Sequence, residues 1–191
     1  MRLGILGGTF DPIHLGHLIL GEVAREELAL DRVLFIPTGV QWRKAGKEIT
    51  PAQHRVAMAR LAVEDNPAFE MSMLEVDRPG PSYTAETLEA LVTERPGSEV
   101  CLILGHDAYE DLPHWVRPER IRELATLAVA ARNGESARLE PPAIRLEMPE
   151  IGISATEIRE RVAAGRTIRY LVPASVEAYI REHGLYGIRG G

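Results

Sequence analysis

Short apolar runs alternate with longer amphipathic stretches along the chain, a pattern that predicts an α/β fold with a parallel sheet. The runs that predict strands are Arg2–Leu6, Val33–Ile36, Phe69–Leu74, Glu99–Leu104, Thr126–Ala131 and Ile144–Met148. Helices are expected between most of these strands. The pattern therefore predicts a Rossmann-like open parallel sheet flanked by helices, with a small C-terminal helical portion.

Several predicted helices begin at residues that can accept hydrogen bonds from free backbone N–H groups. In Thr50–Gln53, a threonine cap, a proline at the first helical position and a capping-box glutamine follow in order. Ser154–Glu157 has the spacing of a second capping box, and Thr84 can cap a helix that runs to about Glu94. Two glycines are placed to end the last two helices: Gly165 and Gly184.

The length and composition fit one globular domain, which we expect to span residues 1–191. Hydrophobic residues make up 45% of the chain and charged residues 26%, as in ordinary globular proteins. The net charge of -6 argues against general binding to nucleic acid or to an anionic membrane. No apolar run is long enough to span a membrane, and Met1–Leu6 is too short for a secretory signal. We therefore expect a cytoplasmic protein, and the sequence leaves a homo-oligomer open.

The single cysteine, Cys101, excludes an internal disulfide and a zinc site built from several cysteines. Cys101 lies in the apolar run Val100–Leu104 and is expected to be a small buried hydrophobe. Only Lys44 and Lys47 of the 22 basic residues are lysines, and both lie in one polar loop. A lysine in such a loop can bring a mobile ammonium group to a phosphate.

The first candidate phosphate site is Gly7–His17, directly after the first predicted strand. Ligands bind open parallel sheets at the carboxyl ends of strands, near the switch in strand order. Gly7 and Gly8 let the backbone approach a ligand, and the helix that follows offers free N–H groups. His14 and His17 are three residues apart, so imidazolium groups facing one direction can donate hydrogen bonds to phosphate oxygens.

The same two histidines have spacing that also suits metal ligands, and a glycine turn beside two exposed histidines is the simplest alternative. No cysteine and no obvious third histidine accompanies the pair, so the strand–glycine–helix context favours phosphate. The segment resembles the G-x-F-x-P-x-H-x-G-H signature of the HIGH-type nucleotidyltransferase superfamily. The matching positions are Gly8, Phe10, Pro12, His14, Gly16 and His17. The resemblance implies ATP binding by residues of this segment, namely Gly7, Gly8, Thr9, Phe10, His14 and His17.

The second candidate phosphate site is Gly152–Arg159, where a late helix begins. Ser154 is expected to cap this helix, with the Thr156 hydroxyl beside the exposed N–H groups and Arg159 one turn further on. Taken alone, the segment fits a capped helix with a surface arginine. Beside the first motif, it resembles the superfamily motif I-S-S-T-x-x-R, with Ala155 in place of the second serine. The resemblance implies that these residues hold the β- and γ-phosphates of ATP.

The chain resembles the bacterial nicotinate-nucleotide adenylyltransferase family over nearly its whole length. The matching segments are Pro37–Lys44, Arg78–Leu88, Leu104–Asp107 with Leu112 and Trp115, and Arg169–Pro173. The resemblance implies that nicotinate mononucleotide is held by the ring of Trp115 and by backbone amides at Thr84 and Val116. Packing in the core or a loop is the alternative for Trp115. Asp107 can accept hydrogen bonds from ribose hydroxyls or act as a helix N-cap.

Three further positions are assigned to the ATP half of this site. Gly105 stands beside Asp107 at the end of a predicted strand. Lys44 resembles the lysine of the family loop that neighbours the phosphates, although Gln41–Lys44 differs from the more common P-P-H-K sequence, and a solvated basic turn is the alternative. Arg132 can lie against adenine or remain on the surface.

The resemblance implies direct displacement at the α-phosphorus of ATP by a phosphate oxygen of nicotinate mononucleotide. The products are deamido-NAD and pyrophosphate, in NAD biosynthesis. Catalysis then depends on positioning and charge stabilisation by His14, His17, Lys44 and Arg159. Mg²⁺ is expected to arrive with ATP, and no metal site of the protein's own is expected. The alternatives are a phosphopantetheine adenylyltransferase, another cytidylyltransferase-like enzyme, a silent nucleotide-binding sensor, and a metal-binding hydrolase that uses the two histidines.

Overall fold

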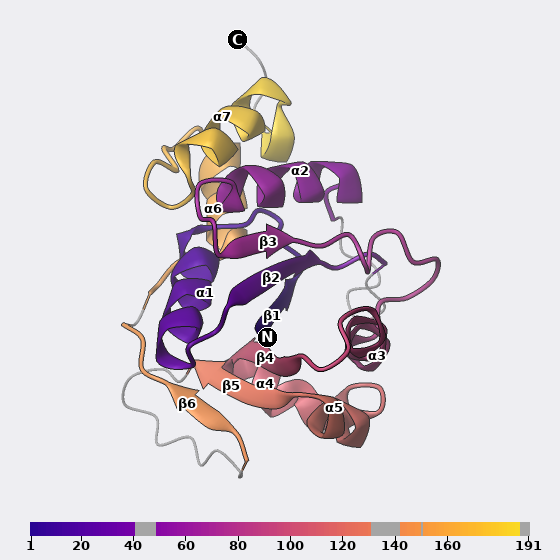
Figure 1. The fold of residues 1–191 in the computed structure, drawn as a ribbon. Helices are drawn as coiled ribbons and strands as arrows, with labels where there is room; N and C mark the ends of the chain where they lie inside the picture. Colours follow the sequence, from indigo (N-terminus) through magenta and orange to yellow (C-terminus); the bar gives the residue numbers. More distant parts are fainter. Residues whose placement is uncertain (41–48, 131–141, 150, 188–191) are drawn as a thin grey trace.

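The chain folds around one parallel sheet with helices on both faces (Figure 1). The computed structural model describes residues 1–40, 49–130, 142–149 and 151–187. In these residues the strand order is β3-β2-β1-β4-β5-β6. The strands are β1 (Arg2–Gly8), β2 (Arg32–Pro37), β3 (Phe69–Met71), β4 (Glu99–Gly105), β5 (Thr126–Ala130) and β6 (Ile144–Leu146). The predicted open parallel sheet is confirmed, and its order is that of doubly wound dinucleotide-binding folds.

The helices divide between two hydrophobic clusters, one on each face of the sheet. One cluster includes α1 (Leu15–Glu27), α2 (Ala52–Val63), α6 (Ala155–Ala163) and α7 (Ala174–Glu182). The other includes α3 (Thr84–Glu94), α5 (Pro118–Leu124) and the 3-10 turn η1 (Leu112–His114). The remaining short elements are α4 (His106–Asp111) and η2 (Leu185–Gly187). The C-terminal helices α6 and α7 stack at one end of the sheet, above α1 and beside α2 (Figure 1).

The alternation of side chains along each strand explains why both faces need helices. In β2, Val33 and Phe35 join the cluster with α1 and α2, whereas Leu34 and Ile36 join the cluster with α3. Successive strand side chains point to opposite faces, so a strand that is apolar at every position must be covered on both. Cys101 is buried in the first cluster, and burial raises the pKa of its thiol to about 11. The predicted structural role of this cysteine is confirmed.

Two predicted strands extend further than the structure allows. β3 ends at Met71, and the N–H of Leu74 then donates to Ser72 Oγ at 3.3 Å in a local turn. β6 ends at Leu146, because the N–H of Glu147 donates to the Glu27 carboxylate at 3.1 Å instead of to a neighbouring strand. Apolar residues just beyond these ends made the strands look longer in the sequence. Conversely, β1 and β4 each continue into the glycines that border the site.

Two predicted helix caps are wrong by one position. α2 and α3 begin after Pro51 and Tyr83, neither of which makes a side-chain cap hydrogen bond, so Thr50 and Thr84 are not caps. Tertiary contacts hold Thr50 outside the helix: its N–H donates to Asp11 Oδ2, and its carbonyl accepts from Arg55 Nε. The other three predictions are confirmed, with Ser154 at the N-cap of α6 and left-handed glycines after α6 and α7 at Gly165 and Gly184.

No helix among the described residues is long and apolar enough to cross a membrane.

Candidate active site

A cavity of about 610 Å³ opens at the carboxyl ends of β1 and β4, where the strand order reverses. Open α/β sheets bind ligands at this switch point, and small-molecule pockets measure roughly 300–1,000 Å³. The sequence-predicted site residues that line the cavity are Gly7, Gly8, Thr9, His17, Thr84, Gly105, Trp115 and Val116. The cavity therefore brings together the turn after β1, the turn after β4, the start of α3 and the Trp115 segment.

The glycines of the first motif are required by the aromatic rings beside them. A Cβ atom at Gly8 would come within 2.8 Å of the Phe10 ring, and one at Gly16 would lie 3.1 Å from the His14 ring. Phe10 itself has a φ of 49°, a left-handed conformation that a non-glycine residue holds only when its surroundings enforce it. Phe10 is buried under the turn and is not among the residues that line the cavity. The motif thus builds a compact support for the histidines.

His14 and His17 lie face to face at the start of α1, with ring centroids 3.7 Å apart. The Phe10 ring packs edge-on against His17 with the centroids 5.0 Å apart. Burial lowers the pKa of His14 to about 4, and burial together with His14 lowers the pKa of His17 well below its usual value. These shifts favour the neutral form of both rings at pH 7 in the chain without a ligand, whereas the sequence predicts imidazolium groups at a bound phosphate. The described residues contain no group of three or more His, Cys, Asp or Glu side chains placed to hold a metal ion.

The backbone of His14 determines which nitrogen of His17 carries the proton. The N–H of His14 donates to Nδ1 of His17 at 3.2 Å. A neutral imidazole that accepts at Nδ1 carries its proton on Nε2. Because His17 lines the cavity, it offers an uncharged N–H donor to a ligand there. His14 is 7% exposed and is not among the cavity residues, so it supports His17 from behind.

The second motif meets the first across the top of the sheet. Arg159, on α6, donates from Nη1 to the carbonyl oxygen of Asp11 at 2.7 Å and from Nη2 to Thr156 Oγ1 at 3.2 Å. Ser154 Oγ accepts from the N–H of Glu157 at 3.1 Å and so caps α6. The two helix beginnings, far apart in the chain, therefore lie side by side. None of these three predicted phosphate-site side chains lines the cavity itself.

Asp11 is the residue through which several segments are joined. Its side chain is 5% exposed; Oδ1 accepts from the Tyr186 hydroxyl at 2.7 Å and Oδ2 from the N–H of Thr50 at 3.2 Å. Burial, followed by the Asp11 carboxylate, raises the pKa of Tyr186. With Arg159 on its carbonyl oxygen, Asp11 ties α6, the start of α2 and the C-terminal turn η2 to the first motif.

The acceptor side of the cavity contains the predicted pyridine-binding residues. Thr84, Trp115 and Val116 all line it, and the Trp115 indole N–H donates to Asp111 Oδ2 at 3.1 Å. That hydrogen bond orients the indole, which lines the cavity and also packs against the second hydrophobic cluster. Asp107 lies exposed in the first turn of α4, and Gly105 occupies the N-cap position, so the alternative role of Asp107 as a cap is wrong.

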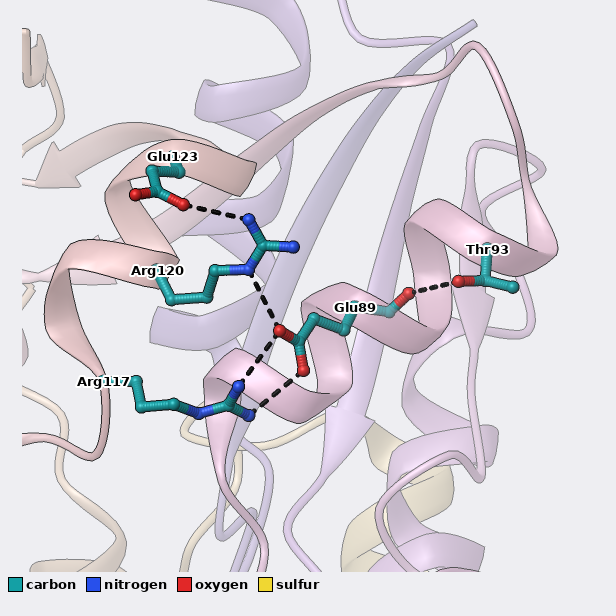
Figure 2. A network of polar contacts seen from close by, with 5 residues as sticks. All are labelled: Glu89, Thr93, Arg117, Arg120 and Glu123. Carbon is teal, nitrogen blue, oxygen red and sulfur yellow. Dashed lines mark hydrogen bonds and ion pairs between the residues drawn. The ribbon is translucent and has the colours of Figure 1, made fainter.

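A surface ion-pair network holds α3 against the segment that follows Trp115 (Figure 2). Glu89, on α3, accepts from both Nη atoms of Arg117 at 3.1 Å and from Nε of Arg120 at 3.0 Å. These two arginines, Arg120 first, lower the pKa of Glu89. Exposed ion pairs of this kind contribute little free energy. The network joins α3 to Arg117, which directly follows Val116 and has a left-handed φ of 55°.

A buried carboxyl group lies in the wall of the cavity close to α3. Glu75 is 7% exposed, accepts from Thr87 Oγ1 at 2.9 Å, and has a pKa that is raised by burial. Ser82, which also lines the cavity, accepts from the N–H of Gly39 at 3.0 Å. These contacts join the end of β2 to the start of α3.

The sequence patterns give no role to Arg55, Glu75 or Tyr186, and they include Asp11 and Ser82 only as members of the segments Gly7–His17 and Arg78–Leu88. Arg55 had a readable signal, because it falls on the same side of α2 as the buried residues Met58 and Ala59. Tyr186 had no such signal, since only the fold brings its hydroxyl to Asp11. Lys44 and Arg132 lie outside the described residues, as does most of the Gly39–Lys47 loop.

The fold and its two motifs define a class of nucleotidyltransferases: residues 5–161 match the family model described as cytidylyltransferase-like. A relative from Thermomicrobium roseum, named as a probable nicotinate-nucleotide adenylyltransferase, is 51% identical over 97% of this chain and 91% of its own length. A relative of the same name from Thermus thermophilus is 49% identical over 97% of this chain and all of its own. The chain belongs to the nicotinate-nucleotide adenylyltransferase family within this class.

Solved structures agree on the fold. The Plasmodium falciparum nicotinic acid mononucleotide adenylyltransferase complexed with NaAD aligns with a TM-score of 0.81 at 18% identity, covering 97% of each chain. A second structure of the same protein, complexed with APC, aligns with a TM-score of 0.79 at 17% identity. At such low identity these alignments support the architecture alone.

Proposed function

We propose that this chain transfers AMP from ATP to nicotinate mononucleotide and releases pyrophosphate. A phosphate oxygen of the mononucleotide forms a bond to the α-phosphorus, and the bond from that phosphorus to the bridging oxygen of pyrophosphate breaks. The attacking phosphate is already ionised, so neither a general base nor a covalent enzyme intermediate is needed. The protein contributes position and electrostatic stabilisation. The product is the dinucleotide deamido-NAD.

The ATP half is proposed to occupy the turns after β1 and β4. Gly7, Gly8, Thr9 and Gly105 form the wall against which the nucleotide lies, and they line the cavity. His17 donates its Nε2 proton to an α-phosphate oxygen as negative charge builds there. The N-terminus of α6, with Ser154, Thr156 and Arg159, receives the β- and γ-phosphates. Mg²⁺ enters with ATP as part of the substrate, and Lys44 and Arg132 are assigned to the same nucleotide from the sequence alone.

The acceptor half is proposed to lie between α3 and the Trp115 segment. The indole of Trp115 stacks on the pyridine ring, and backbone N–H groups at Thr84 and Val116 bind its carboxylate. Asp107 accepts hydrogen bonds from ribose. We also infer that residues 1–191 act as one domain, because both hydrophobic clusters pack on one sheet.

The observation that carries the proposal is the contact between the two motifs. Arg159 binds the carbonyl oxygen of Asp11, which places the start of α6 beside the Gly8–His17 turn. One triphosphate can then contact both helix beginnings. An arrangement in which these segments lay apart would have left His17 and Arg159 without a shared ligand.

A pyrophosphate-release assay tests the function. Wild-type chain, ATP and Mg²⁺ are incubated in parallel with nicotinate mononucleotide, nicotinamide mononucleotide or phosphopantetheine. The proposal requires the nicotinate compound to react fastest by at least about tenfold, because a pocket built for a carboxylate leaves its donors poorly paired with an amide. His17→Ala should reduce turnover by about a hundredfold or more. Equal use of the amide refutes the carboxylate pocket, a preference for phosphopantetheine identifies a different enzyme, and binding without turnover identifies a sensor.

A further inference from the structure

Arg55 is a buried arginine whose guanidinium group joins three separate segments. It projects from α2, is 2% exposed, and does not line the cavity. Nη1 donates to the carbonyl oxygen of Thr9 at 2.8 Å, Nε to that of Thr50 at 2.9 Å, and Nη2 to that of Gly39 at 3.4 Å. The guanidinium is a planar fork with donors on three nitrogens, so it can serve three carbonyl oxygens that lie in different directions.

Two of the three carbonyls belong to opposite halves of the site. Thr9 lines the cavity in the turn after β1, on the proposed ATP side. Gly39 follows β2, and its N–H donates to Ser82 Oγ at 3.0 Å. Ser82 lines the cavity immediately before α3, on the proposed acceptor side. A continuous path of hydrogen bonds therefore runs from Thr9 through Arg55 and Gly39 to Ser82.

The backbone at Gly39 has little freedom to compensate if this path is broken. A Cβ atom at Gly39 would lie 2.2 Å from the carbonyl oxygen of Glu75, so the two backbones are in direct contact. Beyond it, the N–H of Ser82 donates to the carbonyl of Val40 at 3.0 Å. The segment before α3 thus follows the position of Gly39 closely.

Burial of the guanidinium is unfavourable, and the structure shows what offsets it. Burial lowers the pKa of Arg55, while the nearby Asp11 carboxylate raises it. Asp11 also accepts hydrogen bonds from Tyr186 and Thr50, so the charge facing Arg55 is itself fixed in place. A buried charge is retained only with such partners, and apolar residues of similar volume are often as stabilising. An apolar residue at this position would leave the carbonyl oxygens of Thr9, Thr50 and Gly39 without this donor, so the arginine fixes where these three backbone segments lie.

We infer that Arg55 is a positioning residue that keeps the ATP-binding turn and the acceptor-binding segment in register, so that attacking oxygen and α-phosphorus meet in line. This role rests on the proposed function. Because Arg55 touches neither substrate, its loss should change kcat at saturation of both substrates more than it changes either KM. Misplacement of reacting groups by about 1 Å can cost roughly a hundredfold in rate.

The test uses Arg55→Lys and Arg55→Met in the full chain, with Arg60→Met as the matched control. Arg60 lies on the same helix but is exposed and lines a separate groove between α2 and α7. Steady-state kinetics with ATP and nicotinate mononucleotide are measured well below each thermal midpoint. For Arg55→Lys, which keeps the charge but not the fork, kcat should fall about thirtyfold to a hundredfold while each KM changes less than about fivefold. Arg60→Met should match wild type.

The outcomes distinguish failure of the positioning role of Arg55 from failure of the proposed function. A folded Arg55→Lys variant with wild-type kcat, or with raised KM values alone, would overturn the positioning role. If Arg55→Met does not fold, the lysine variant still decides the question. A wild-type chain that does not convert nicotinate mononucleotide, with Arg60→Met equally inactive, refutes the proposed function and this role with it.

Discussion

One hydrogen bond from the backbone of His14 to Nδ1 of His17 sets the chemistry of the site at the residue scale. It leaves the proton of the neutral ring on Nε2, where a ligand in the cavity can accept it. Burial keeps both rings uncharged at neutral pH. A neutral donor needs no change of protonation state during the reaction, so its contribution is constant over the pH range in which the rings stay neutral.

The pH dependence of activity tests the neutral pair. Because the pKa of His14 is lowered to about 4 and that of His17 is also lowered, kcat/KM should be level between about pH 7 and about pH 8, above the second pKa of the substrate phosphates at about 6. The two buried histidines should add their full contribution to the free energy of unfolding above about pH 6.5. That contribution should decrease as the pH drops towards about 4, because the unfolded chain then binds protons that the native state does not. If kcat/KM instead decreases as the pH rises through about 6.5, activity requires a protonated group with an ordinary histidine pKa, and the neutral pair is contradicted.

Gly105 offers a second test at this scale, because its backbone is unstrained and there is room beside it for a methyl group. It lines the cavity, its φ is -71°, and a Cβ atom there would meet no atom within 4 Å. Gly105→Ala should therefore fold normally yet raise the KM for ATP by about tenfold, as a methyl group enters the nucleotide's space. Gly165→Ala is a control with the reverse expectation. Because Gly165 has a φ of 65°, this variant should lose about 1 kcal/mol of stability and keep the wild-type KM for ATP. Unchanged ATP kinetics in Gly105→Ala would remove Gly105 from the site.

At the scale of elements, much of the fold follows from local patterns. All six strands and the glycine ends after α6 and α7 can be predicted from apolar runs and turn residues. The start of α2 cannot, because the contacts that Thr50 makes with other residues hold it outside the helix. Thr50 is held by Asp11, which is distant in sequence, and by Arg55, which lies on the following helix. Local propensity does not contain that information.

The cap of α6 can be separated from phosphate binding by two substitutions. Ser154 Oγ accepts from the N–H of Glu157, so Ser154→Ala should lower stability by about 1 kcal/mol, whereas Ser154→Gly should lower it by a few tenths. If the hydroxyl also contacts the triphosphate, both variants should raise the KM for ATP by about fivefold. Urea unfolding and steady-state kinetics measure the two effects. A normal KM in Ser154→Gly would limit this serine to capping.

At the scale of the whole molecule, segments from both ends of the chain meet at Asp11. Asp11 belongs to the first motif, and three other segments each donate one hydrogen bond to it: the start of α2, α6 and the C-terminal turn. The motifs predict the two phosphate sites separately, but neither motif contains Arg55 or Tyr186. Those residues reach the site only when the sheet and α7 are in place. Sequence patterns therefore predict the residues that bind phosphate better than the residues that hold them in position.

Tyr186→Phe tests this convergence without altering the cavity. Removing the hydroxyl leaves Asp11 Oδ1 buried without its donor, which should cost about 1–3 kcal/mol of stability. Because Asp11 also holds Arg159, the KM for ATP should rise several-fold. Tyr170→Phe, at a side chain on a residue that is 80% exposed, should leave both quantities unchanged. Thermal unfolding and ATP kinetics provide the readout, and wild-type behaviour of Tyr186→Phe would show that η2 does not support the site.

The most direct measurement is a crystal structure of the chain with a non-hydrolysable ATP analogue and nicotinate mononucleotide. The account predicts an α-phosphate oxygen within hydrogen-bonding distance of His17 Nε2, at roughly 2.7–3.2 Å, and the terminal phosphates at the N-terminus of α6. It also predicts the pyridine ring against Trp115. A triphosphate that contacts only one of the two helix beginnings, or that lies outside the cavity between β1 and β4, would contradict it.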